Sequence, residues 1–310
     1  MARPLRAPTN RSGSMKRPSM SAVYGLALNP DGTLLAAAGP GKGIIFDTAS
    51  GNAVIKIPGA TGHAYDVDFA PDSKSVVICF HGGHVRQYDV QSGDEIASYT
   101  GHAGVPQGVR KVKFSPDGQQ LASVAEDSTL RIWDTQSTDE VQRFKARADV
   151  NTVAWGPGES HITFATDVGL HTVEIASRRG KTLDTGAIAD VQVVNNQILA
   201  AWDEAIRFLT PDLEITRTLE QSAVSRMRAY EGYLFAASWS GADAGVHRWD
   251  LSDGTRQRLP LPAPVGDGPH AVWALAIDAA RGVLYAGCNP MKGSSNIVAW
   301  DCASLDLLDL

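Results

Sequence analysis

The sequence predicts an all-β chain made of seven repeated units, each a small antiparallel sheet of four strands. Three observations lead to this prediction. Residues 109–134 contain three short strands joined by tight turns, the same pattern returns about every 42 residues, and the repetition continues from residue 23 to residue 310. Because a repeat of this length forms one unit that packs on its neighbours, we expect a single array rather than two ordinary domains.

The unit is clearest in residues 109–134. Val109–Phe114 alternates apolar and polar residues, and Ser115–Gly118 supplies Pro, Asp and Gly in the order that a tight turn favours. Leu121–Ala125 alternates again, and Leu130–Trp133 forms a third strand after a second polar turn. Acidic residues in such turns cap backbone N–H groups, so we expect a structural role for them.

The end of the third strand marks each repeat. The residues that close it are Asp47, Asp89, Asp134, Glu174, Thr210, Asp250 and Asp301. Each unit begins with its own first strand, and these strands are Val23–Leu28, Ala64–Phe69, Val109–Phe114, Val150–Trp155, Ile188–Val193, Val224–Ala229 and Val272–Ile277. A polar turn and a fourth strand follow each third strand, and Leu305–Leu310 is expected to supply the last of them.

The third repeat resembles the WD-repeat (WD40) family over its full signature. It contains Gly101-His102, the turn Ser115–Gly118 and the pair Trp133-Asp134. The resemblance covers about residues 22–310 and implies a seven-bladed β-propeller of four-stranded antiparallel sheets. It also implies a buried hydrogen-bonded set, which in this sequence consists of His102, Ser123, Asp127 and Trp133.

Other repeats depart from the signature. At the position of the signature tryptophan they have Phe46, Tyr88, Val173 and Leu209. We therefore expect these sheets to be held together by apolar packing.

Composition agrees with one large folded unit. The chain has 310 residues, 43% of them apolar, and 30 glycines for turns. No run of 18 apolar residues occurs, so we expect no membrane partner. Cys79, Cys288 and Cys302 form no disulfide framework, which favours a cytoplasmic location.

Residues 1–21 differ from the rest of the chain. They contain five basic residues, three prolines and no acidic residue, which predicts a flexible basic arm before the propeller of residues 22–310. Since the whole chain has a net charge of −6, the body without the arm carries about −11. We therefore expect no nucleic acid on the propeller body.

Candidate catalytic motifs have simpler explanations. Cys79–His84 contains one thiol and two imidazoles, but Gly82 and Gly83 are typical of a hairpin turn and no second pair of zinc ligands occurs. Gly39–Gly43 is rich in glycine but lies between strands and opens no helix that could hold phosphate. The sequence predicts no metal, no cofactor and no catalytic residue.

The family resemblance places one residue of each innermost strand near the mouth of the central channel. These residues are Tyr24, Tyr65, Arg110, Asn151, Ala189, Ser225 and Trp273. Trp273, Tyr24, Tyr65 and Arg110 come from neighbouring blades of the ring and form an arc of the residue types that dominate interfaces. Turns on the same face add His81, Glu126, Trp202 and Trp239.

The arc predicts a non-catalytic scaffold that binds a protein or peptide through the top face of the propeller. An enzyme or a small-ligand sensor that uses the central channel is the alternative. Core packing of the same aromatic residues is a second alternative, since large aromatic side chains also fill the space between blades.

Overall fold

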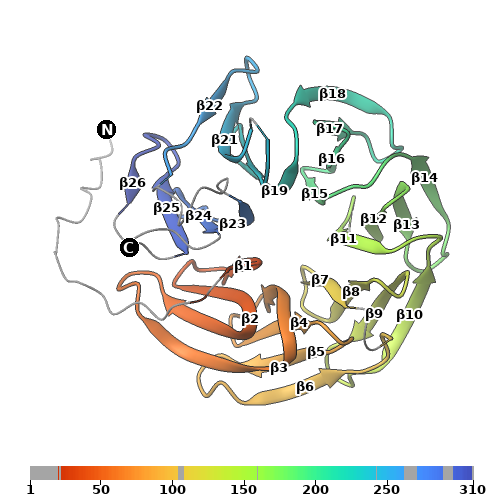
Figure 1. Cartoon of the computed structure of the whole chain (residues 1–310). Helices are drawn as coiled ribbons and strands as arrows, with labels where there is room; N and C mark the ends of the chain where they lie inside the picture. Colours follow the sequence, from red (N-terminus) through yellow and green to blue (C-terminus); the bar gives the residue numbers. More distant parts are fainter. Residues whose placement is uncertain are drawn as a thin grey trace, which may run out of the picture.

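The computed structural model describes residues 20, 22–103, 108–158, 160–241, 243–261, 271–288 and 296–308. All 26 regular elements in these residues are β-strands (Figure 1). The described part of the chain therefore contains no helix that could cross a membrane. Most of the basic arm expected at residues 1–21 lies outside the described residues, but Met20 is described and buried.

The first sheet has six strands in the order β1 to β6. They are β1 (Gly25–Leu28), β2 (Leu34–Asp47), β3 (Ala53–Phe69), β4 (Ser75–Phe80), β5 (Val85–Asp89) and β6 (Glu95–Tyr99). We expected two separate sheets of four strands here. They merge because β2 and β3 run on through the glycine-containing segments around Gly41 and Gly59, where separate strands were expected.

Pairing within this sheet still follows two units. The first half of β2 pairs with β1, as in Gly25 with Ala38, and its second half pairs with the first half of β3, as in Gly43 with Ile57. The remaining half of β3 pairs with β4, as in Val67 with Ile78.

The other five sheets each contain four antiparallel strands in sequence order. The first two are β7 (Val109–Phe114), β8 (Gln120–Ala125), β9 (Thr129–Asp134), β10 (Glu140–Lys145) and β11 (Val150–Trp155), β12 (His161–Thr166), β13 (Gly169–Glu174), β14 (Gly180–Asp184). The next is β15 (Asp190–Val194), β16 (Gln197–Trp202), β17 (Ala205–Leu209), β18 (Ile215–Glu220). The last two are β19 (Val224–Tyr230), β20 (Tyr233–Ser238), β21 (Gly245–Asp250), β22 (Arg256–Arg258) and β23 (Val272–Asp278), β24 (Val283–Cys288), β25 (Ile297–Asp301), β26 (Leu307–Leu308).

The sheets are arranged around a common centre, with β1, β7, β11, β15, β19 and β23 nearest to it (Figure 1). Hydrophobic clusters fill the space between neighbouring sheets. One of them joins the first and last sheets, because Val23 and Ile44 pack in the same cluster as Ala274 and Ala299. The described N-terminal and C-terminal sheets therefore contact each other by side-chain packing.

The acidic residues that close the third strands are turn residues. The carboxylates of Asp47, Asp89, Asp134, Asp250 and Asp301 accept hydrogen bonds from the backbone N–H three or two residues later. At Asp47, hydrogen bonds from the hydroxyl and the backbone N–H of Ser50 hold the pKa of the carboxyl below its ordinary value. The repeated acidic residues therefore order the turns, as the sequence predicts.

Candidate partner-binding face

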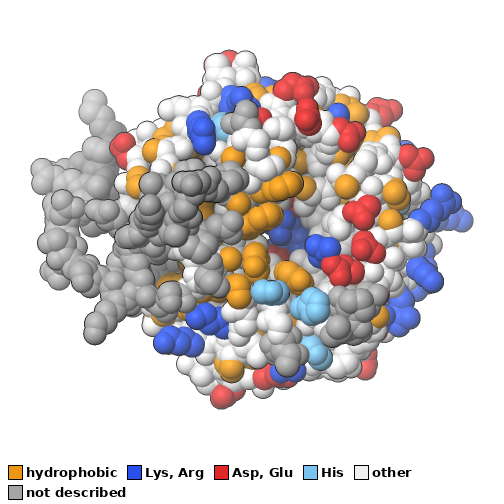
Figure 2. All heavy atoms as spheres, in the orientation of Figure 1, with side chains coloured by type: hydrophobic (Ala, Val, Ile, Leu, Met, Phe, Trp, Pro, Cys, Tyr) orange, Lys and Arg blue, Asp and Glu red, His pale blue; other side chains and the backbone are white. Residues whose placement is uncertain are grey.

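A chain of aromatic rings crosses the face on which the innermost strands begin. The ring of Tyr24 lies 6.2 Å from that of Tyr65, and the ring of Tyr65 lies 6.3 Å from that of His81. His63, which the sequence analysis did not select, contacts both tyrosines at 5.7 and 6.2 Å. Figure 2 shows histidine and hydrophobic side chains next to each other near the centre of this face.

An ion pair extends this chain of rings. The Arg110 guanidinium lies 2.5 Å from the Glu126 carboxylate, and the Arg110 side chain remains 45% exposed. Glu126 also accepts a hydrogen bond from the backbone N–H of Gly108, whose backbone lies against the ring of Tyr65. Burial, and then the charge of Glu126, raise the pKa of Tyr65. Arg110, Glu126 and Tyr65 thus form one continuous surface.

Two tryptophans form a second aromatic group. The rings of Trp239 and Trp273 are stacked, with centroids 6.1 Å apart and planes 15° apart. Trp239 is 46% exposed, although large apolar side chains are usually buried. This stack presents a wide apolar surface to solvent.

A β-bulge explains why these side chains share one orientation. In five innermost strands the register with the next strand shifts at the same place, and the residues at that place are Tyr65, Arg110, Asn151, Ser225 and Trp273. A bulged residue is left unpaired and its side chain is re-aimed. Five of the seven positions that the family resemblance singled out are therefore bulged, while Tyr24 and Ala189 lie at no such register shift.

The four residues of the predicted structural set meet inside the sheet β7–β10. His102 Nδ1 lies 2.9 Å from Asp127 Oδ2, and His102 Nε2 lies 2.7 Å from Ser123 Oγ. Trp133 Nε1 donates to the same Ser123 hydroxyl at 2.8 Å. Burial acts to raise the pKa of Asp127, but hydrogen bonds from His102 and Thr129 outweigh it and hold that pKa well below its ordinary value.

Residues 93–134, which contain this set, match the family model described as WD domain, G-beta repeat. This segment is similar to one WD40 repeat. A comparison with curated proteins finds no similar sequence. Repeats of this family generally form scaffolds for protein interactions.

A second sheet of the chain contains a variant of the polar set. In the sheet β19–β22, Trp249 Nε1 donates to Gln221 at 2.6 Å, and Gln221 donates to the Ser238 hydroxyl at 3.0 Å. Glutamine here takes the place of histidine. Sequence reasoning missed this set because no Gly-His pair marks it.

Trp202 differs from the other residues predicted for the partner face. It is buried and packs in the cluster that contains Ile198 and Leu209. The Arg207 guanidinium lies 4.2 Å from the centre of its ring. In this structure the Trp202 ring therefore belongs to the interior, and only its neighbours in the turn Asp203–Glu204 face outward.

Charged side chains of several sheets meet at the centre around which the sheets are arranged. Lys111 Nζ lies 2.5 Å from Asp190 Oδ1 and donates to Thr152 Oγ1 at 3.0 Å, so one lysine joins β7, β11 and β15. Asp190 Oδ2 accepts a hydrogen bond of 2.9 Å from the backbone N–H of Met227 on β19. Burial lowers the pKa of Lys111 to about 8. The Asp190 carboxylate opposes this lowering, and Lys111 in turn lowers the pKa of Asp190, so each group favours the charged form of the other.

The segment Cys79–His84 forms a hairpin turn in the structure. Gly82 and Gly83 have φ values of 86° and 84°, and Phe80 N–H donates to the carbonyl of His84. Cys79 lies in the core, where burial raises the pKa of its thiol well above the ordinary value. Among the described residues no group of three His, Cys, Asp or Glu side chains is placed to hold a metal ion.

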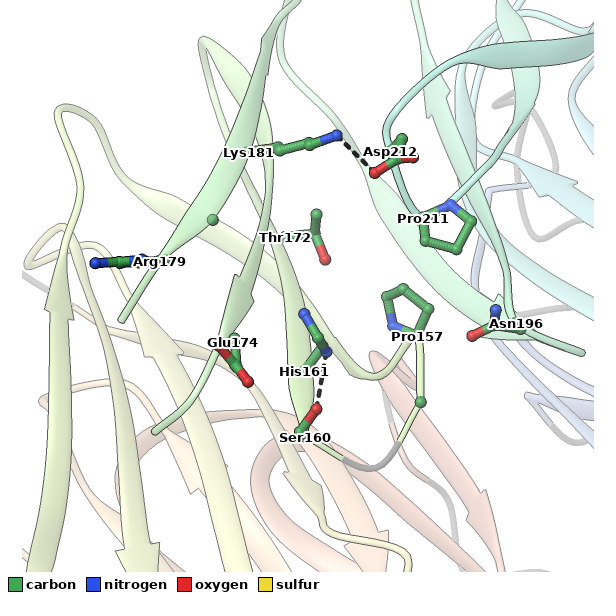
Figure 3. Close-up of a pocket in the computed structure, with 12 residues that line it drawn as sticks. Pro157, Ser160, His161, Thr172, Glu174, Arg179, Lys181, Asn196, Pro211 and Asp212 are labelled. Atoms are coloured by element: carbon green, nitrogen blue, oxygen red, sulfur yellow. Dashed lines mark hydrogen bonds and ion pairs between the residues drawn. The ribbon is translucent and has the colours of Figure 1, made fainter. Parts of the chain in front are cut away.

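A separate pocket of about 600 Å³ lies at the rim, between the sheets β11–β14 and β15–β18. Figure 3 shows that Thr172 points into it, while Pro157 and Pro211 line one side. Lys181 Nζ and the Asp212 carboxylate meet across it at 2.6 Å. None of the residues predicted for the partner face lies in this pocket.

Proposed function

We propose that the chain is a seven-bladed WD40 propeller that binds a protein or peptide partner on the face of Tyr24, Tyr65, Arg110 and Trp273, and that it catalyses no reaction. The division of the first sheet into two pairing units supports the count of seven. The innermost strands of the blades are then β1, the second half of β3, β7, β11, β15, β19 and β23.

The shared β-bulge is the observation that carries this proposal. In five innermost strands it takes one residue out of the ladder, and three of these five residues are Tyr65, Arg110 and Trp273. Tyrosine, tryptophan and arginine bury large areas with few rotatable bonds and keep a polar end, which makes them frequent anchors of interfaces. Partial exposure of Trp239 and Arg110 leaves this surface open to a partner.

Alanine at an anchor should weaken partner binding. We expect Trp273→Ala and Tyr24→Ala each to cost ~2 kcal/mol or more of binding free energy, which is roughly a 30-fold rise in Kd. The partner is first isolated by affinity capture from the native cell and identified, and its affinity for each purified variant is then measured by calorimetry. Tyr230→Ala is the matched control, since Tyr230 lies at the opposite end of β19.

Melting midpoints of the same variants separate binding from folding. Unchanged midpoints with weakened binding support the proposal. If Trp273→Ala and Tyr24→Ala bind the partner like the wild type but melt earlier, these residues belong to the core. The partner site would then lie elsewhere, for example on the turns Asn29–Gly32 and Ser115–Gly118.

Several expectations about partners stay predictions. The acidic body supports the expectation that nucleic acid does not bind the propeller, since phosphate groups attract basic surfaces. The cytoplasmic location, the absence of a membrane partner and the alternative of a channel-based enzyme or ligand sensor also stay predictions.

A further inference from the structure

The residues directly after the seven positions predicted near the channel mouth form one level around the centre of the molecule. These residues are Gly25, Asp66, Lys111, Thr152, Asp190, Arg226 and Ala274. The contacts of Lys111 with Thr152 and Asp190 connect three different sheets, which places this level at the centre. Side chains repeat on one side of a strand every two residues, so the next level includes Asp68, Lys113 and Arg228.

Positive charge exceeds negative charge in these two levels. They contain the cations Lys111, Lys113, Arg226 and Arg228 and the carboxylates Asp66, Asp68 and Asp190. Lys113 pairs with Asp68 at 2.6 Å, and Lys111 pairs with Asp190 at 2.5 Å. Burial opposes the ionisation of Asp190, but Lys111, Arg226 and Arg228 outweigh it and hold its pKa below the ordinary value. Three cations therefore act on one carboxylate.

The two arginines have hydrogen-bond donors to spare. A guanidinium has five N–H donors. Arg226 donates from Nη1 to the carbonyl of Ser225 at 2.8 Å, and among the described residues it forms no ion pair. Arg228 donates from Nη1 to the carbonyl of Met227 at 2.6 Å and lies 3.8 Å from Asp190. Both side chains are half-buried, so solvent ions can reach them.

The location suits a small ion. Figure 2 shows basic side chains at the centre of the face, in the hollow around which the sheets are arranged. Arg226 and Arg228 are two positions apart on β19, where equivalent side chains lie roughly 7 Å from each other. Two guanidinium groups at this spacing can hold one tetrahedral oxyanion between them, because each presents N–H donors in a planar fork.

We propose that Arg226 and Arg228 bind a small oxyanion of the phosphate or sulfate class at the centre of the propeller. The anion balances the excess positive charge around Asp190. It also accepts hydrogen bonds from the guanidinium N–H groups that have no acceptor among the described residues. Arg226 and Arg228 follow the bulged residue Ser225 by one and three positions on β19. The site therefore depends on other side chains than the partner-binding face, and it goes beyond the proposed function. No covalent step is involved.

Calorimetry with inorganic phosphate tests the proposal on the full chain at about 150 mM salt, where weak surface attraction is screened. We expect saturable binding with one site and a Kd between roughly 10 µM and 1 mM. Arg226→Gln and Arg228→Gln should each weaken binding by roughly tenfold or more, because each removes charged hydrogen bonds. Phosphate should also raise the melting midpoint of the wild type more than those of the variants.

Arg179→Gln is the matched control, because it removes the same charge from the rim pocket. It should bind phosphate like the wild type. The proposal is overturned if the wild type shows no saturable binding at roughly 10 mM phosphate. It is also overturned if Arg226→Gln and Arg228→Gln bind phosphate like the wild type while their melting shows that they are folded. Loss of binding in Arg179→Gln alone would overturn it as well. Sulfate in place of phosphate shows which oxyanion the site prefers.

Discussion

Asp190→Ala should lower the free energy of unfolding by about 3–5 kcal/mol, the cost of breaking a buried ion pair by removing one partner. The substitution leaves the Lys111 ammonium, whose side chain is 3% exposed, without its carboxylate. It also removes the acceptor of the Met227 backbone N–H on β19. Urea unfolding should show a lower midpoint at an unchanged slope, since the surface exposed on unfolding stays the same.

Asp212→Ala is the matched control for this prediction. Asp212 pairs with Lys181 at 2.6 Å, nearly the same distance, but its side chain is 69% exposed. Exposed ion pairs contribute about 0–1 kcal/mol, so this variant should unfold almost like the wild type. Equal losses in the two variants would mean that the Lys111–Asp190 pair is open to water and that the central network does not connect the sheets.

Trp133→Ala should cost about 3–5 kcal/mol for the lost packing of a large buried side chain. A further ~1–3 kcal/mol comes from leaving the Ser123 hydroxyl without the Trp133 N–H, beside the buried His102. Trp133→Phe keeps most of the apolar ring and should lose mainly the hydrogen-bond part. Thermal melting and urea unfolding measure the loss of stability in both variants.

Trp239→Ala provides the comparison, because Trp239 is a tryptophan of the same protein that is 46% exposed. It should change stability by less than about 1 kcal/mol, as for other surface substitutions. A Trp133→Ala variant with an unchanged melting midpoint would show that the hydrogen-bonded set does not hold the blade together. In that case a functional role for Asp127 and His102 would have to be considered again.

Local alternation and turn chemistry identify most strands from the sequence. Val109–Phe114 and Val150–Trp155 have the expected bounds, because each ends at a turn. The expected Val23–Leu28 begins later in the structure, at Gly25. The merged strands β2 and β3 were not predicted, since glycine and proline between two strands favour a turn in any sequence pattern.

Contacts between sheets were less accessible to sequence reasoning. Lys111 and Asp190 are 79 positions apart and meet only because the sheets surround one centre. The contact of His63 with Tyr24 likewise joins residues that are far apart in the sequence. Trp202 shows the opposite problem: its predicted place in a turn suggested exposure, yet the ring packs against the core beside Arg207.

Hydrogen exchange of the protein with its captured partner locates the partner-binding surface, because it reports on every backbone segment without a mutation. We expect partner-dependent protection in residues 22–26, 63–66, 108–111 and 271–274, which contain Tyr24, Tyr65, Arg110 and Trp273, and in the turn at Trp239. The rim pocket around Thr172 and the turn Ser115–Gly118 should exchange as in the free protein. Protection confined to the rim pocket or to the turns Asn29–Gly32 and Ser115–Gly118 would contradict binding at Tyr24, Tyr65, Arg110 and Trp273. The partner would then bind another surface.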